Sequence, residues 1–195
     1  MKMEIRQYDQ SDEVAWVRCR VLSFLDTAYF DHVLQKKETY GNPAIELVAV
    51  EEGQLIGLLD IEYETKEGSV CSRGAGLGGM IWHIAVHPDF RSSGVGRQLL
   101  QEAERRARAE NLSRLEAWTR DDLWVQAWYE KNGFIKVDSY LHVYLENGEA
   151  EASLTSDIPF LKPIHAFAHY VGADRERVKS KFNRVHECVC YEKKL

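Results

Sequence analysis

The chain has 195 residues and a formal net charge of −6, from 25 Lys and Arg against 31 Asp and Glu. This balance argues against a general nucleic-acid-binding protein, and no apolar run approaches the roughly 20 residues that cross a bilayer. With 45% hydrophobic residues, the sequence predicts one soluble α/β domain over residues 1–195. The first residues lack the apolar core of a signal peptide, so we expect a cytoplasmic protein without nucleic-acid or membrane partners.

The predicted elements begin with a strand over residues 2–8 and a helix over residues 14–25. Ser11 is the expected N-cap of this helix, because an Asp and a Glu follow it in the first turn. A second, short helix is expected over residues 27–37.

A hairpin comes next, because two apolar runs at 45–51 and 55–63 are separated by Glu52-Gly53-Gln54. Residues 68–79 then contain five glycines, too many for a regular element. Two interpretations stay open for this stretch: a mobile loop beside a binding site, or an ordinary long connection.

A strand over residues 81–86 leads through a glycine-rich turn into a helix. The helix is predicted from one apolar face of small residues at intervals of four: Val95, Leu99, Ala103 and Ala107.

The turn before this helix has the chemistry of an anion cradle. Gly94 and Gly96 let a ligand approach the backbone, where amide N–H groups lack partners at the helix start. Arg91 and Arg97 flank the turn and can bond phosphate oxygens, so a pyrophosphate would fit. The alternative is a glycine turn with a solvated basic rim.

The rest of the chain is predicted to complete the sheet. Residues 113–119 form a strand parallel to the 81–86 strand, because a strand-helix-strand unit makes a right-handed crossover. A helix over 123–132, capped by Asp121 or Asp122, is followed by strands over 134–144 and 186–193, and an inserted helical pair is expected at about 146–185.

The cysteines and histidines do not predict a metal site. The four cysteines have neither a CxxC pair nor a His-Cys zinc spacing, so reduced, buried thiols are expected. His165 and His169 are one helical turn apart, but no third ligand is apparent.

Two motifs resemble the GNAT superfamily of acyl-CoA-dependent N-acyltransferases. Arg91-Ser-Ser-Gly94-Val-Gly96 is similar to the loop that this family uses for the CoA pyrophosphate, and Trp128-Tyr-Glu-Lys-Asn-Gly-Phe134 is similar to its second signature. The resemblance implies an α/β (α+β) fold with a mixed, mostly antiparallel sheet, flanked by helices, in which a parallel strand pair splays apart at the CoA cleft.

The same resemblance implies the contacts to acetyl-CoA. Asp122 stands where many relatives have Asn, and Val125 where they often have Ala, which affects the helix-side contacts. The implied contacts are Ile84, Ala85, Val86, Arg91, Ser92, Ser93, Gly94, Val95, Gly96, Arg97 and Asp122.

For the chemical step, Tyr129 occupies the signature tyrosine position and is the expected proton donor to the CoA thiolate. The base is expected to be His83, because an imidazole ordinarily titrates near neutrality, or Glu62 or Asp60 on the neighbouring strand. A packed tyrosine and a satisfied core histidine are the alternatives.

The function implied is acetyl transfer from acetyl-CoA to a primary amine of an unidentified small-molecule or peptide acceptor, by direct attack in a ternary complex. The alternative is a non-catalytic acyl-CoA sensor or interaction module. Acidic net charge favours a cationic acceptor. Residues 157–171 are expected to wall the acceptor side or to form a homodimer surface, and other candidate acceptor contacts are Tyr29, Phe30 and His32.

Overall fold

One sheet of eight strands, in the order β1-β2-β3-β4-β5-β8-β6-β7, organises the computed structural model, which describes residues 3–195. In this part of the chain the β4–β5 pair is parallel and every other pair is antiparallel. The strands are β1 (Glu4–Gln7), β2 (Ala44–Glu51), β3 (Gln54–Tyr63), β4 (Gly78–Val86), β5 (Arg114–Thr119), β6 (Ile135–Leu145), β7 (Ala166–Tyr170) and β8 (Arg184–Lys194).

The helices are α1 (Glu13–Phe24), α2 (Val95–Ala109), α3 (Leu123–Lys131), α4 (Glu149–Ser153) and α5 (Arg175–Lys181). This arrangement confirms the predicted fold class and the parallel entry of β5 beside β4. The predicted first strand is seen as β1, and Lys2 lies outside the described residues.

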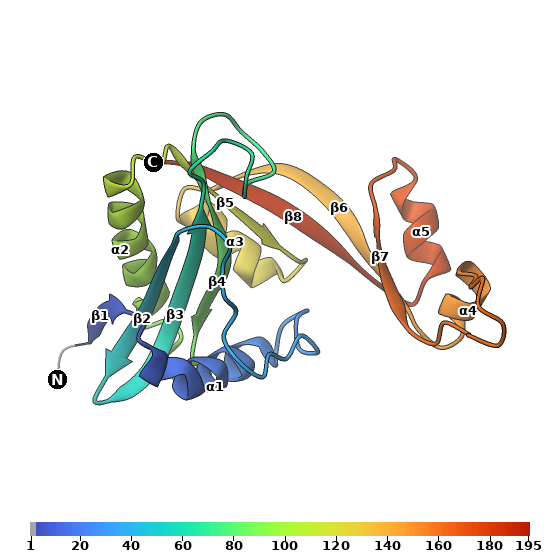
Figure 1. Cartoon of the computed structure of the whole chain (residues 1–195), viewed down its shortest axis with the longest axis horizontal. Coiled ribbons are helices and arrows are strands. Elements are labelled where there is room, and N and C mark those ends of the chain that lie inside the picture. Colours follow the sequence, from blue (N-terminus) through green and yellow to red (C-terminus); the bar gives the residue numbers. More distant parts are fainter. Residues whose placement is uncertain (1–2) are drawn as a thin grey trace.

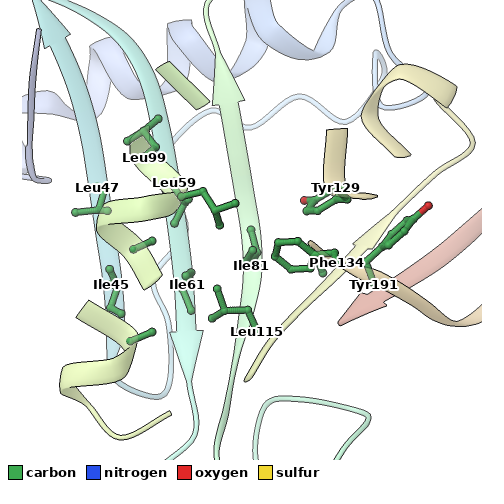
Figure 2. Close-up of a cluster of buried hydrophobic side chains, with 14 of the residues drawn as sticks. Ile45, Leu47, Leu59, Ile61, Ile81, Leu99, Leu115, Tyr129, Phe134 and Tyr191 are labelled. Carbon is green, nitrogen blue, oxygen red and sulfur yellow. The ribbon is translucent and has the colours of Figure 1, made fainter. Parts of the chain in front are cut away.

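Buried side chains alternate between two faces of the sheet. On β2, Leu47 joins the core that packs under α2, whereas Val48 joins the core that packs under α1. Figure 2 shows Leu99 of α2 in the first of these cores, with an aromatic group at its far end: Tyr129, Phe134 and Tyr191.

Helix α2 lies close to β3 because Gly57 has no side chain. A Cβ atom there would lie 2.9 Å from Val95 Cγ1 and 3.0 Å from Leu99 Cδ1. The small apolar face predicted for the helix is therefore matched by a glycine in the strand beneath it.

Two predictions near the N-terminus are wrong. The N-cap of α1 is Asp12, and Asp9, whose side chain accepts from the Ser11 N–H, caps a 3-10 turn over Gln10–Asp12 before it. Residues 27–37 form turns instead of a helix. Backbone groups of this segment form hydrogen bonds with side chains that are distant in sequence; the Ala28 N–H, for example, donates to Asp122.

A long arm projects from the body of the molecule (Figure 1). It consists of the outer parts of β6 and β8 and carries α4, β7 and α5 at its end. Two short helices, α4 and α5, lie within the expected insertion, but the apolar stretch before Gly172, expected to be the first helix of the pair, contains the strand β7. β7 pairs with β6, from Leu145↔Ala166 to Leu141↔Tyr170.

The glycine-rich loop between β3 and β4 is tied down by two buried carboxylates. Glu64 accepts backbone N–H groups from Gly68, Cys71 and Gly78, and Glu116 accepts from Ser72. Although burial acts to raise it, these hydrogen bonds hold the pKa of Glu64 below its ordinary value. Gly78 and Gly79, which were expected in the loop, begin β4.

All four cysteines are free and buried. Within residues 3–195, no group of three or more His, Cys, Asp or Glu side chains is placed to hold a metal ion. No helix in the described range is both long and apolar enough to span a bilayer.

Candidate active site

A cleft of about 1270 Å³ opens where β4 and β5 separate. The parallel pairing begins at Gly78↔Arg114 and ends at Ile81↔Ala117, while β4 continues to Val86 against β3 alone. The two strands therefore splay, and the outer half of β4 lines the cleft together with Trp118 and Thr119 of β5. None of the described residues of the glycine-rich loop, 65–77, lines this cleft, so the loop is not beside the candidate site.

The start of α2 forms one end of the cleft. Gly94 is the N-cap of α2, with φ 88°, and Ser92 has φ 62°. Only glycine adopts the left-handed region at low cost, so the chain turns tightly here and presents the first amide N–H groups of the helix to the cleft. This end of the cleft therefore has the geometry and partial positive charge of an anion site.

Arg91 is held at the rim by an acidic partner that the motif does not reveal. Its Nη1 lies 2.5 Å from Asp26 Oδ2, and its Nη2 donates to the Ser23 carbonyl at 2.8 Å. The guanidinium also lies 5.2 Å from the ring centroid of Trp124. Arg91 thus connects α1 and α3 at the rim of the cradle.

Most residues predicted to contact acetyl-CoA line this cleft. Ser93 is the exception, because its hydroxyl donates to the Phe90 carbonyl at 2.5 Å. Asp122 lines the cleft, but both of its carboxylate oxygens accept from the Ala28 N–H, at 3.1 and 3.0 Å. The lining members of the predicted set are Ile84, Ala85, Val86, Arg91, Ser92, Gly94, Val95, Gly96, Arg97 and Asp122.

Tyr129 reaches the cleft from α3. Its ring is packed edge-on against Trp128 and Phe134 and stacked on Tyr191. Burial raises the pKa of Tyr129 above its ordinary value, so the phenol keeps its proton at neutral pH. The side chain is therefore both fixed in position and able to donate a hydrogen bond into the cleft.

His83 lines the cleft from β4, but both of its ring nitrogens have partners. Arg20 Nε donates to Nδ1 at 3.3 Å, and Nε2 lies 2.5 Å from Glu38 Oε2. Because a guanidinium only donates, Nδ1 is the acceptor and the ring proton sits on Nε2, facing Glu38. His83 therefore has no free lone pair, whereas Glu38 keeps carboxylate oxygen exposed in the cleft.

The other two predicted bases lie outside the cleft lining. Glu62 accepts from Asn42 and from Trp82 Nε1, each at 2.9 Å, so it sits behind Trp82. Asp60 is fully buried and pairs with Lys37 at 2.9 Å. Neither carboxylate is brought to the place where β4 and β5 separate.

The arm supplies one wall of the cleft. Its side chains alternate along two paired strands and so share one face. His142 stacks on Phe167, with ring centroids 5.0 Å apart. Burial, reinforced by nearby Arg120, lowers the pKa of His142 to about 4, so the imidazole is uncharged at pH 7. The wall is formed by Tyr140, His142, Tyr144, Phe167 and His169.

Residues 8–134 match the sequence profile of the acetyltransferase (GNAT) family. The chain belongs to this family. An acetyltransferase of Pectobacterium atrosepticum is 28% identical over 141 residues, which cover 70% of this chain and 90% of that protein. Among solved structures, an acetyltransferase of the GNAT family from Streptococcus pneumoniae has a TM-score of 0.63 at 15% identity, with 100% of both chains covered.

A second GNAT-fold neighbour was solved in complex with coenzyme A. This N-acetyltransferase from Thermoplasma acidophilum has a TM-score of 0.58 and 14% identity, and 100% of both chains are covered. At this identity the likeness shows the fold, and it confirms the predicted GNAT architecture.

Glu38 and Arg120 are among the cleft residues of this GNAT chain that were missed by sequence reasoning. Glu38 lies in a polar stretch without periodicity, and Arg120 lies in the short link between β5 and α3. Tyr29 and His32 do line the cleft, whereas Phe30 is exposed beneath Arg184. Glu38 and Arg120 had no sequence signal, because only the folded chain brings them to the cleft.

Proposed function

We propose that this GNAT acetyltransferase transfers the acetyl group of acetyl-CoA to a primary amine. One observation carries the proposal: a single cleft joins the amide cradle at α2 to the wall of the arm, through the gap between β4 and β5. A long co-substrate entering from the cradle and an amine entering from the arm side would meet in that gap. Orientation of this kind supplies much of the rate in a direct transfer.

The cradle suits the pyrophosphate of acetyl-CoA. The amides at the start of α2 point to it, Gly94 and Gly96 leave room, and Arg97 adds a positive charge. The pantetheine chain contains amides, and within residues 3–195 the β4 edge that faces β5 has no strand partner beyond Ile81, so its main-chain groups can bond them. The acetyl group would then lie near Trp82 and His83.

In the chemical step, the amine nitrogen attacks the thioester carbon, and the carbon–sulfur bond then breaks. Tyr129 donates its proton to the departing thiolate, since its burial keeps the phenol protonated. We assign the removal of the amine proton to Glu38, directly or through one water, because its carboxylate faces the cleft. His83 is then the residue that positions Glu38.

Two measurements test the proposal. Titration calorimetry should show acetyl-CoA binding that Gly96→Glu abolishes, because the new carboxylate opposes the phosphates; Gly96→Ala, whose Cβ would meet Val86 Cγ2 at 3.4 Å, is the steric control. A panel of amines with detection of released thiol tests transfer. Binding without thiol release for any amine would favour the non-catalytic acyl-CoA sensor.

A further inference from the structure

Arg120 is a buried arginine on the acceptor side of the cleft. It is 6% exposed and follows directly after β5. Its Nη1 donates to the Ala28 carbonyl, and its guanidinium lies 4.2 Å from the ring centroid of Tyr29 and 5.5 Å from that of Tyr144. The guanidinium thus lies near two aromatic rings, and Arg120 lines the cleft.

Within residues 3–195, no carboxylate oxygen lies within 4.0 Å of the Arg120 guanidinium, although two other arginines at the cleft or the arm have such partners. Arg91 pairs with Asp26 at 2.5 Å, and Arg184 pairs with Asp31 at 2.6 Å. A buried charge is costly unless an opposite charge compensates it. The buried Arg120 guanidinium would therefore be stabilised by a bound anion.

The carboxylates that line the cleft are already committed to other donors. Asp31 pairs with Arg184, Glu38 with His83, and Asp122 with the Ala28 N–H. None of the three is left to neutralise Arg120 by direct contact. Asp31 and Asp122 interact with Arg120 electrostatically without contacting it, so a ligand anion could supply the direct partner.

The surroundings of Arg120 also suit such a ligand. His142 is uncharged at pH 7, so its ring can donate one N–H to an anion without a charge of its own. The flat wall of His142 stacked on Phe167, beside Tyr144, suits an apolar or aromatic body. Glu38, to which removal of the amine proton is assigned, lines the same cleft as Arg120.

We propose that the acceptor is an amine that also bears a carboxylate, an amino acid with an apolar or aromatic side chain, and that Arg120 binds this carboxylate. The inference rests on the proposed acetyl transfer and specifies its acceptor. The net charge of −6 of the whole chain favours a purely cationic acceptor, whereas the positive charge of Arg120 in the cleft favours an acceptor that also carries a carboxylate. Local charge decides binding here, because Arg120 is buried where solvent screens little.

Matched acceptor pairs that differ only in the carboxylate test the inference. We would compare phenylalanine with 2-phenylethylamine, tryptophan with tryptamine, and methionine with 3-(methylthio)propylamine, following thiol release at fixed acetyl-CoA. The wild type should prefer the amino acid in kcat/KM. Arg120→Gln should reduce this preference by roughly 10- to 100-fold, mainly through KM of the amino acid, and Arg120→Lys should restore part of it.

Arg175→Gln is the control, because the Arg175 guanidinium bonds Ser139 and Glu187 of the same arm and does not line the cleft. It should leave the preference unchanged. Equal use of both members of each pair by the wild type, or equal losses in both arginine variants, would overturn the role of Arg120 while leaving acetyl transfer intact. Absence of transfer to every amine, despite acetyl-CoA binding, would overturn the proposed function and this inference with it.

Discussion

The Nε2 nitrogen of His83 lies 2.5 Å from Glu38 Oε2, and this contact decides which of the two groups faces an acceptor. The hydrogen bond from His83 holds the pKa of Glu38 below its ordinary value. Glu38 is therefore ionised throughout the neutral range, with its side chain 44% exposed.

Glu38→Gln should lower kcat/KM for the amine by roughly 100-fold or more, because a positioned base is lost. Acetyl-CoA affinity, measured by calorimetry, should stay the same. Glu62→Gln is the control, since Glu62 lies behind Trp82 and should matter little. If Glu62→Gln lowered kcat/KM strongly and Glu38→Gln did not, Glu62 would be the base, as the sequence suggested.

The pH profile gives a separate test of the same pair. The active form of Glu38 is the carboxylate, so the acid limb of kcat/KM should lie below about pH 4.3, the ordinary glutamate value. His83→Phe removes the hydrogen bond that lowers this pKa, so the acid limb should move to higher pH. An unmoved limb would show that His83 does not act on the base.

Tyr129→Phe should lower kcat by roughly 100-fold with little change in KM for acetyl-CoA, because it removes the donated proton and keeps the ring packing. Tyr191→Phe is matched to it, since Tyr191 stacks on Tyr129 and its hydroxyl donates to Glu130 at 3.0 Å, outside the cleft lining. Steady-state kinetics of both variants distinguish the hydroxyl from the packing. Equal kcat in Tyr129→Phe and the wild type would exclude the acid role.

Gly57→Ala should lower the free energy of unfolding by about 1–3 kcal/mol, because the new Cβ would crowd Val95 and Leu99 of α2. Gly41→Ala is the control, since its nearest atom would be Glu62 Oε1 at 4.0 Å. Urea unfolding of both variants measures the difference. Similar midpoints would mean that α2 can move away from β3 without cost.

The pKa of His142, about 4 because burial opposes its charge, makes stability depend on pH. The ordinary histidine value is about 6.5, so between pH 6.5 and 4 the unfolded chain binds a proton that the folded chain does not. The free energy of unfolding therefore does not change with the ionisation of His142 above about pH 6.5, and it decreases as the pH falls from 6.5 to 4. Glutamine does not titrate, so the His142→Gln variant should lose less stability than the wild type between pH 7 and pH 4. Urea unfolding of both proteins at several pH values measures this difference.

The sequence predicts the α2 half of the candidate site well and the acceptor half poorly. Gly94, Gly96 and Arg97 are contiguous, and local geometry at a helix start is encoded locally. Glu38 and Arg120 reach the cleft only through pairings with distant residues, His83 and Ala28, that no local pattern encodes. Tyr129, which lines the cleft, could be proposed from the sequence because its signature segment is continuous.

Contacts between residues distant in sequence also explain why secondary structure was wrongly predicted in two segments. Residues 27–37 have helical spacing of apolar side chains, but Asp122 and Arg120 take the N–H and carbonyl of Ala28. The strand β7 was predicted as part of a helix, because it spans only Ala166–Tyr170 and so short a strand gives a weak alternating pattern. Its pairing partner, β6, decides the outcome, and tertiary pairing overrides so short a pattern.

The early end of the β4–β5 pairing has a consequence for solvent exchange. Beyond Ile81, the amides of β4 that face β5 have no strand partner in the described chain, so in the free protein their hydrogens are open to exchange with deuterium. A pantetheine chain lying along that edge would act as a substitute strand and slow exchange at alternate positions between Trp82 and Val86. The register of protection would then report which way the co-substrate runs, without any chemical step.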